Sequence, residues 1–152
     1  MERPPRAHRL DARVGSLPVP RHRLGARDGG PDALRTAVNV PFEPYASDLD
    51  YLNAFDDVVA PAVRSFGPDL LVTQNGADAL ATDPLTHLAL TLRGYHALVE
   101  RLAALSHELC DGRMVAFGGG GYDWGSAVPR AWALLAYSLL DREPPRELLA
   151  EH

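Results

Sequence analysis

The sequence predicts an α/β fold in which a parallel sheet carries flanking helices. Short apolar runs of strand length alternate with longer segments whose apolar residues recur at helical spacing. The order strand, helix, strand, helix, strand, helix is the pattern of right-handed crossovers in a parallel sheet. The chain has 152 residues, of which 46% are hydrophobic and 23% charged, values that are ordinary for one globular domain with a core.

Three segments are predicted as strands. AVNVPF at residues 37–42 is short and ends at a proline, DLLVTQ occupies residues 69–74, and RMVAF occupies residues 113–117. Strand-to-helix loops leave a parallel sheet at the carboxyl edge of its strands, where ligands usually bind. The loops at residues 75–90 and 118–125 are therefore expected to lie side by side.

Three segments are predicted as helices. The first covers residues 47–66, with Ser47 as N-cap, and Pro61 is expected to kink or divide it. The second covers residues 91–110 and has one apolar stripe. The third covers residues 126–140, with a proline tolerated in its first turn.

The predicted organisation has three parts. Residues 1–35 are crowded with Arg, Pro and Gly and show no apolar period, so we expect an irregular or disordered lead-in. Residues 36–140 form the domain, and residues 141–152 form a tail. A net charge of −5 offers no basic face for nucleic acid, and no apolar run reaches the roughly 18 residues of a membrane span. The single cysteine, Cys110, is expected at a buried helix end and fits a cytoplasmic protein.

The loop FGGGGYDWG at residues 117–125 has several readings. It lacks the GxxxxGK[ST] and GxGxxG patterns, so phosphate binding rests only on a nearby helix N-terminus. A flexible turn would explain one or two glycines but not four. Glycines also let backbone approach a ligand closely, and Tyr122 is then a candidate hydrogen-bond donor to an oxyanion. The alternative for Tyr122 is a packed aromatic between sheet and helix.

The loop at residues 75–90 contains Asp78, Asp83 and His87. A carboxylate at this edge is a candidate ligand for a divalent metal, which His87 could join. Capping and turn roles explain most loop aspartates, and a surface position is the commoner case for histidine. Spacing alone leaves both interpretations open.

Five stretches together resemble a known family: VNVPF, DLLVTQNGADALATDPL, LALT, VAFGGGGYDW and PRAWALL. In order and spacing they are similar to the C-terminal portion of the histone deacetylase family, in its bacterial acetoin-utilisation branch. The resemblance implies the arginase/deacetylase fold and zinc-dependent hydrolysis of acetyl-lysine or a small acetylated amine. It also implies that Asp83 is a zinc ligand and that Tyr122 polarises the acetyl carbonyl. Gly120 and Leu90 would line the acyl tunnel, and Asp78 would serve local hydrogen bonding.

The sequence departs from that family pattern. It has neither the paired histidines of the general acid/base nor the Asp-x-His motif with the other two zinc ligands. We therefore expect a chain that is inactive alone. Three parallel strands from a larger sheet would also leave unpaired edges and apolar helix faces, so we expect aggregation or dependence on a partner. The alternatives are a non-catalytic α/β remnant acting as an interaction module, and a split enzyme completed by an N-terminal deacetylase fragment or by self-association.

The lead-in itself suggests a frame shift. PRHR stands at residues 20–23, where the family has Pro-Gly-Thr-Gly, and a one-base shift in GC-rich codons converts one into the other. The upstream nucleotides test this hypothesis, which fails if no other frame there encodes the missing motifs.

Overall fold

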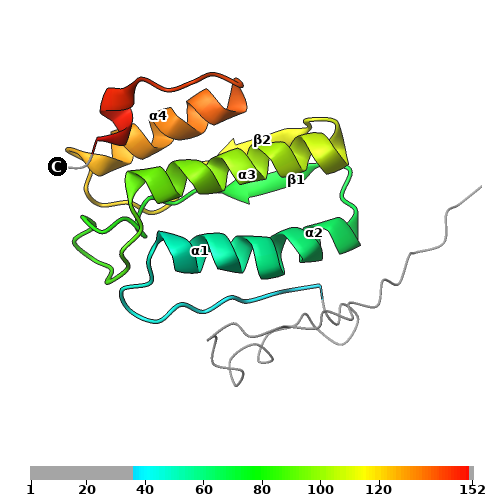
Figure 1. Ribbon diagram of the computed structural model, residues 1–152, viewed down its shortest axis with the longest axis horizontal. Helices are drawn as coiled ribbons and strands as arrows, with labels where there is room; N and C mark the ends of the chain where they lie inside the picture. The colour runs from blue at the N-terminus through cyan, green and yellow to red at the C-terminus, as the bar shows by residue number, and fades with distance from the viewer. Residues whose placement is uncertain (1–35, 151–152) are drawn as a thin grey trace, which may run out of the picture.

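The computed structural model describes residues 36–150, so the predictions for residues 1–35 lie outside the described part (Figure 1). The elements, in chain order, are α1 (Asp48–Ala54), the π-helical η1 (Phe55–Val59), α2 (Ala60–Phe66), β1 (Leu71–Gln74), α3 (Leu92–Cys110), β2 (Met114–Phe117), α4 (Ala127–Leu139) and the 3₁₀ helix η2 (Arg146–Leu149). None of the helices within residues 36–150 is both long and apolar enough to cross a membrane.

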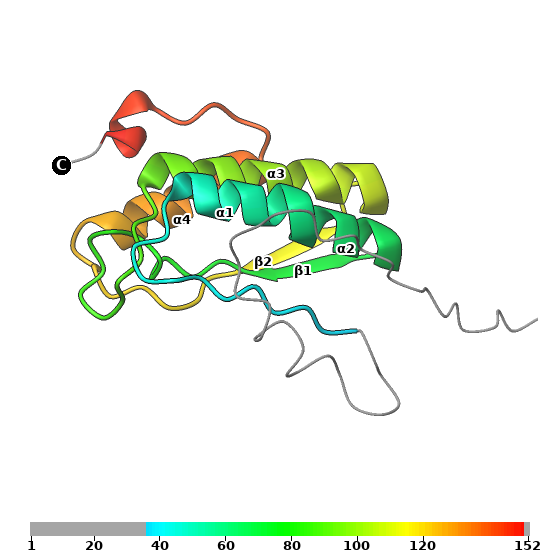
Figure 2. The same ribbon diagram turned by 60° about the horizontal axis from the view of Figure 1, so that its bottom comes forward.

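The two strands pair in parallel. The register runs from Leu71 opposite Met114 to Gln74 opposite Phe117. Side chains alternate between a half-buried inner face and an exposed outer face, as the two-residue period of a strand requires. Figure 2 shows α1, α2 and α3 above the same face of the strands. The helices thus cover one side of the sheet.

The prediction of a strand at residues 37–42 is wrong. Residues 36–43 have no regular secondary structure, and the sheet of the described residues has the order β1-β2 alone. A strand exists only when a neighbour accepts its hydrogen bonds, and Pro41 also removes one donor. The apolar pattern of these residues is typical of a strand, but it cannot show whether a second strand lies beside them to form the hydrogen bonds of a sheet.

The first predicted helix runs through α1, η1 and α2 with a π turn in the middle. Pro61 is the second residue of α2 and has no N–H for the carbonyl four residues back, so the backbone widens just before it. At the start, the Ser47 amide and hydroxyl both donate to Asp50 Oδ2, at 2.8 and 2.7 Å, which lowers the pKa of Asp50. At the end, Gly67 takes a left-handed φ of 64° that suits glycine.

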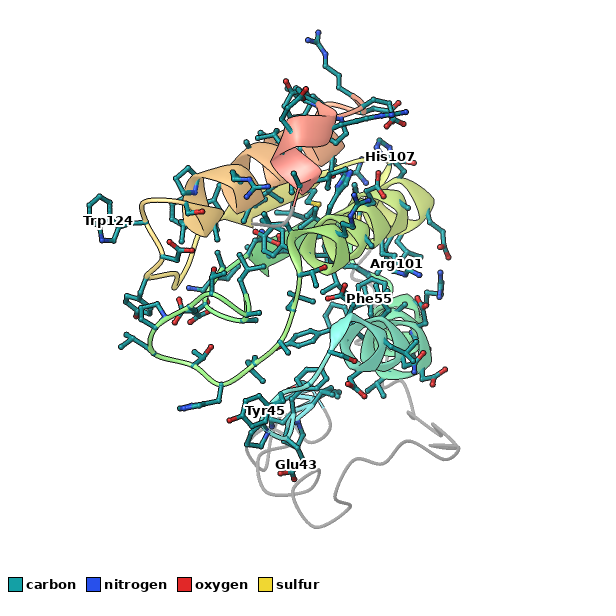
Figure 3. The ribbon with its side chains drawn as sticks, turned by 60° about the vertical axis from the view of Figure 1, so that its left-hand side comes forward. Glu43, Tyr45, Phe55, Arg101, His107 and Trp124 are labelled. Carbon is teal, nitrogen blue, oxygen red and sulfur yellow. The ribbon has the colours of Figure 1, made fainter. Side chains whose placement is uncertain are left out.

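The core joins the long helices to the two loops. One buried cluster consists of Ala77, Leu80, Leu90, Leu92, Tyr95, Val99, Ala127, Val128, Ala131, Leu134 and Leu135. A second, smaller cluster of Phe55, Ala60 and Leu105 lies between the first helix and α3, with Phe55 labelled in Figure 3. Cys110, 1% exposed at the end of α3, confirms the buried helix-end prediction.

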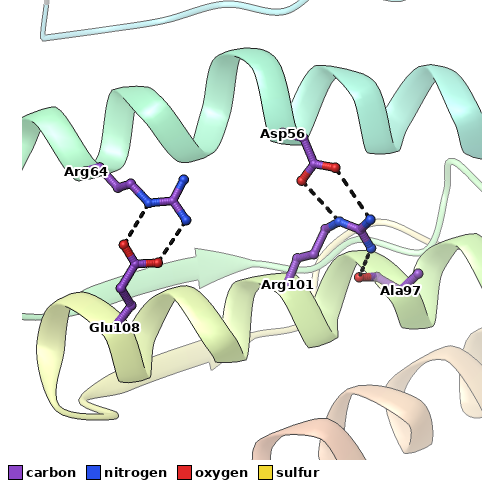
Figure 4. Close-up of polar contacts among 5 residues, drawn as sticks. All are labelled: Asp56, Arg64, Ala97, Arg101 and Glu108. Carbon is purple, nitrogen blue, oxygen red and sulfur yellow. Dashed lines mark hydrogen bonds and ion pairs between the residues drawn. The ribbon is translucent and has the colours of Figure 1, made fainter.

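Two ion pairs also join the first helix to α3 (Figure 4). The Arg64 guanidinium donates to both carboxylate oxygens of Glu108, at 2.7 and 2.8 Å. Arg101 donates to the two oxygens of Asp56, at 3.1 and 3.4 Å. Exposed pairs of this kind contribute little stability, so the apolar contacts dominate this interface.

The tail folds back onto α4. Arg130 of α4 donates to the main-chain carbonyls of Glu147 and Leu148, at 3.2 and 3.0 Å, and also to that of Ala150. Leu148 and Leu149 pack against the larger core cluster. The 3₁₀ turn is therefore held by the domain.

Candidate functional site

The two loops meet at the carboxyl edge of the strands, which confirms the expectation drawn from the crossover pattern. The Ala77 amide donates to the Gly120 carbonyl at 2.6 Å. The Thr82 hydroxyl donates to Asp123 Oδ2 at 2.7 Å. Because β1 and β2 are parallel and in register, the loops that follow them leave the sheet at the same edge.

Asp83 lies at the centre of this contact and is 6% exposed. Its Oδ1 accepts from the amides of Leu85 and Thr86, at 2.9 and 3.3 Å. Its Oδ2 accepts from the Tyr122 amide at 2.9 Å. The first two bonds form a local turn after the aspartate, and the third binds the other loop. Three backbone donors therefore fix the orientation of the carboxylate.

The backbone of Tyr122 is held by a hydrogen bond, but the residue is exposed to solvent. The residue is 49% exposed, and Trp124 two positions on is 82% exposed and points away from the domain (Figure 3). The aromatic residue that bridges strand and helix is instead Trp132 of α4. A Cβ atom added at Gly118 would lie only 3.0 Å from the Trp132 ring. The phenol of Tyr122 is thus available at the edge of the sheet.

The glycine run is required by packing between the loops. A Cβ at Gly120 would lie 2.2 Å from Asp78 Oδ2, and one at Gly119 would lie 2.9 Å from the Gly76 Cα. Gly121 has a φ of 144°, which side chains rarely adopt. The Asp78 carboxylate occupies the space that a larger residue at position 120 would need. The loop is therefore a close backbone contact, and the tunnel role of Gly120 remains a prediction.

Asn75 is a structural residue of the site that the sequence reading missed. It is 6% exposed, and its Nδ2 donates to Thr73 Oγ1 at 2.9 Å and to the Phe117 carbonyl at 3.2 Å. Its own carbonyl accepts from the Tyr95 hydroxyl and the Trp132 indole, both at 3.1 Å. The available signal was an asparagine directly after a strand, a position that favours side-chain bonds to nearby backbone.

Asp123 is a second missed residue. Its Oδ2 accepts from the Ala127 amide at 3.3 Å, and its carbonyl accepts from the Val128 amide at 3.1 Å. An acidic residue at the N-terminus of a helix satisfies free amides and suits the helix dipole. Asp123 therefore fixes the start of α4 next to Tyr122.

Leu90 and His87 do not join this arrangement. Leu90 is 3% exposed and belongs to the larger core cluster, where it bridges to Leu80. His87 is exposed, and its ring lies edge-on to Tyr45 with centroids 6.4 Å apart. The structure thus brings Asp83, Gly120 and Tyr122 together and leaves Leu90 in the interior.

The described residues do not by themselves fit a zinc site. No group of three or more His, Cys, Asp or Glu side chains that could hold a metal occurs among residues 36–150. A catalytic zinc normally takes three protein ligands, and Asp83 supplies one. Further ligands would have to come from outside this part of the chain.

The parallel strands, the helices on them and a site at the carboxyl edge define the chain as an α/β protein of the crossover class. The histone deacetylase domain model matches residues 20–139, and the chain belongs to that family. This confirms the resemblance read from the sequence. The match begins upstream of residue 36.

The curated relatives belong to the acetoin-utilisation branch. The chain is 38% identical over 114 residues to the acetoin utilization protein AcuC of Staphylococcus xylosus, covering 75% of this chain and 30% of that protein. It is 37% identical over 113 residues to AcuC of Bacillus subtilis (strain 168), covering 74% and 29%. The chain thus spans about 30% of the length of these relatives.

Solved structures show the same fold. The histone deacetylase Clr3 matches with a TM-score of 0.63 and 33% identity, covering 72% of this chain and 18% of that one. The HD domain of HDA15 matches with a TM-score of 0.67 and 32% identity, covering 80% and 34%. The deacetylase fold predicted from the sequence is confirmed.

Proposed function

We propose that the chain provides one side of a histone-deacetylase-like site that hydrolyses the amide of acetyl-lysine or of a small acetylated amine. The observation that carries the proposal is the hydrogen bond between the Tyr122 amide and Asp83 Oδ2. It holds in one fixed relation the two residues to which the family resemblance assigns zinc binding and polarisation of the acetyl carbonyl. Family membership supports the same chemistry.

The proposed role of Tyr122 is to donate a hydrogen bond to the substrate, which requires an exposed phenol. A half-exposed phenol on a backbone-anchored loop can donate a hydrogen bond to the carbonyl oxygen of a bound acetyl group. Such a donor stabilises the negative charge that develops on that oxygen during amide hydrolysis. The hydrogen bond to Asp83 supports this role because it keeps the tyrosine loop from moving away.

Asp83 and Gly120 complete this side of the site. Asp83 is proposed as one ligand of the zinc ion on which the family depends, an ion that activates water and polarises carbonyls when bound. Gly120 is proposed to border the acyl group, as the family resemblance implies. Leu90 has the same assignment by resemblance, although its burial in this chain places it behind the surface.

The chain is proposed to be inactive alone. Residues 36–150 offer no cluster of three metal ligands, and the sequence has no histidine pair to move protons. A complementary deacetylase segment would supply both, which is the split-enzyme form of the proposal. The competing candidate is a non-catalytic α/β module, favoured by the single metal ligand. In either form we propose a cytoplasmic hydrolase-family protein.

Zinc content and hydrolysis separate these candidates. The full chain is purified alone and mixed with AcuC of Staphylococcus xylosus from which the matched segment has been removed, and each sample is assayed with an acetyl-lysine reporter. We expect zinc uptake and hydrolysis only in the mixture. Tyr122→Phe should then lower kcat by about 10²–10³, the usual effect of losing one oxyanion donor.

The outcomes are distinct. Stoichiometric zinc and hydrolysis by the chain alone, both lost in Asp83→Ala, would show that the chain is not inactive by itself. A mixture that never cleaves the reporter, with zinc absent, would favour the non-catalytic module. Full activity of Tyr122→Phe in an active mixture would remove the role proposed for the phenol.

A further inference from the structure

Among the residues that the structure describes, no strand lies beside one edge of β1. The Leu71 amide donates to the Arg113 carbonyl at 3.1 Å and the Asn75 amide donates to the Phe117 carbonyl at 2.8 Å. In a parallel pair alternate residues bond to the same neighbour, so the peptide groups of Val72 point to the opposite edge. No other strand is paired at that edge within residues 36–150.

An apolar groove runs along this free edge. Its volume is about 420 Å³, and it is lined by Thr36, Val38, Val40, Val59, Ala62, Val63, Phe66, Pro68, Leu70, Leu71 and Val72. Four of the lining side chains are well exposed: Val38 at 49%, Leu70 at 48%, Val72 at 57% and Phe66 at 69%. The wall opposite β1 is the segment that was predicted as a strand.

The lining selects the kind of occupant. It contains no charged or titratable side chain, so a polar ligand or a metal finds no partner there. A free strand edge beside exposed valines and leucines is instead a template for another strand. Main-chain bonds would form along Val72, and the groove would receive the alternate side chains of the incoming strand.

We propose that the groove binds an extended apolar strand, parallel to β1, from the part of a deacetylase domain that the relatives have and this chain does not match. This inference rests on the proposed function. The chain covers 30% of its Staphylococcus xylosus relative, and 34% of the HDA15 domain. Most of such a domain therefore lies outside the matched segment, and the free edge is where it would continue the sheet.

The orientation links the groove to the site. Purely parallel sheets are over-represented, and β1 already pairs in parallel with β2. A strand parallel to β1 ends at the same edge as Gln74, so the loop that follows it would lie beside the loop of Asp83. That is where further zinc ligands are needed.

The test uses the full chain and, as the binding partner, synthetic peptides that together cover the part of Staphylococcus xylosus AcuC that this chain does not match, with affinity measured by calorimetry. The peptides need no fold of their own, because the groove is proposed to bind an extended strand. Val72→Pro removes the edge donor, while the β1–β2 bonds come from the alternate residues. Val38→Glu places a charge in the groove and lies outside any helix or strand. Leu140→Glu is the matched control, because Leu140 is 66% exposed and does not line the groove.

We expect the wild-type chain and Leu140→Glu to bind equally, and the two groove variants to bind about tenfold more weakly or worse, the effect of roughly one lost interaction. Circular dichroism melting checks that each variant folds. Val38→Glu keeps the test decisive if Val72→Pro does not fold.

Three results would overturn the inference. They are no binding of the partner, binding that neither variant weakens, and formation of dimers of this chain through the β1 edge instead of the complex with the partner. The proposed function fails separately. If binding depends on Val72 but zinc uptake and hydrolysis do not occur, the groove assignment holds and the proposed activity is wrong. If hydrolysis occurs but neither variant weakens binding, the proposed activity holds and the groove assignment is wrong.

Discussion

The Tyr122 amide donates a 2.9 Å hydrogen bond to Oδ2 of Asp83, so the candidate carbonyl donor and the candidate zinc ligand are directly connected. The bond runs between loops that lie 39 positions apart in the chain. Asp83 therefore has a structural role that does not depend on a metal, and the predictions below separate that role from catalysis.

Asp83→Ala should destabilise the domain without any metal present. The change leaves three backbone N–H groups without their acceptor at a position that is 6% exposed, a loss worth about 1–3 kcal/mol. Urea unfolding of the full chain measures it. Asp57→Ala, at an exposed helical aspartate, is the matched control and should change the free energy of unfolding by less than about 0.5 kcal/mol. Equal midpoints for both variants would contradict the structural role.

Gly120→Ala should also destabilise the domain, because its Cβ would lie 2.2 Å from Asp78 Oδ2. Overpacking of this kind costs about 1–3 kcal/mol. Gly125→Ala is the control, since nothing lies within 4 Å of a Cβ there. The double variant with Asp78→Ala should recover part of the loss in a double-mutant cycle. A purely additive cycle would mean that Asp78 is not the obstacle.

The stability of the domain should fall at high pH through Tyr51. Burial, helped by the negative charge of Asp78, raises the pKa of Tyr51 to about 12. A raised pKa means that the folded chain holds the phenolic proton more tightly than the unfolded chain, whose tyrosine pKa is about 10. The contribution is therefore complete below about pH 10 and is lost as the pH rises through about 12.

Tyr51→Phe should flatten this dependence, measured as the thermal midpoint against pH. Burial also raises the pKa of Tyr95, so a residual alkaline loss from that residue is expected in the variant. An unchanged slope between pH 10 and 12 in Tyr51→Phe would show that Tyr51 titrates normally.

Asn75→Ala should loosen the junction between the strands and the site. The variant leaves Thr73 Oγ1 and the Phe117 carbonyl without the Nδ2 donor, at a residue that is 6% exposed. The expected loss is about 1–3 kcal/mol in urea unfolding. Asn53→Ala, at an exposed helical position, should be nearly neutral. A loss no larger than that of Asn53→Ala would show that the Asn75 side chain is dispensable.

Local rules predicted most of the elements. The apolar stripe predicted α3 from Thr91, which is indeed the N-cap and accepts from the Gly94 amide at 3.0 Å, and the first helix widens just before the proline that was expected to disturb it. The meeting of the two loops followed from the direction of parallel strands alone. The strand at residues 37–42 failed because pairing depends on a neighbour that the local pattern does not contain.

The sequence by itself determined the order of the helices and of the two paired strands, the family, and the candidate positions Asp83, Gly120 and Tyr122, because periodicity, capping and motif spacing depend on residues that are close together in the chain. Only the tertiary structure decided that the Asp78 carboxylate fills the space beside Gly120, that Leu90 turns into the core, and that Asn75 and Trp132 join strand to helix. These outcomes depend on which atoms compete for the volume between two loops, and residues far apart in sequence settle that competition only when the chain is folded.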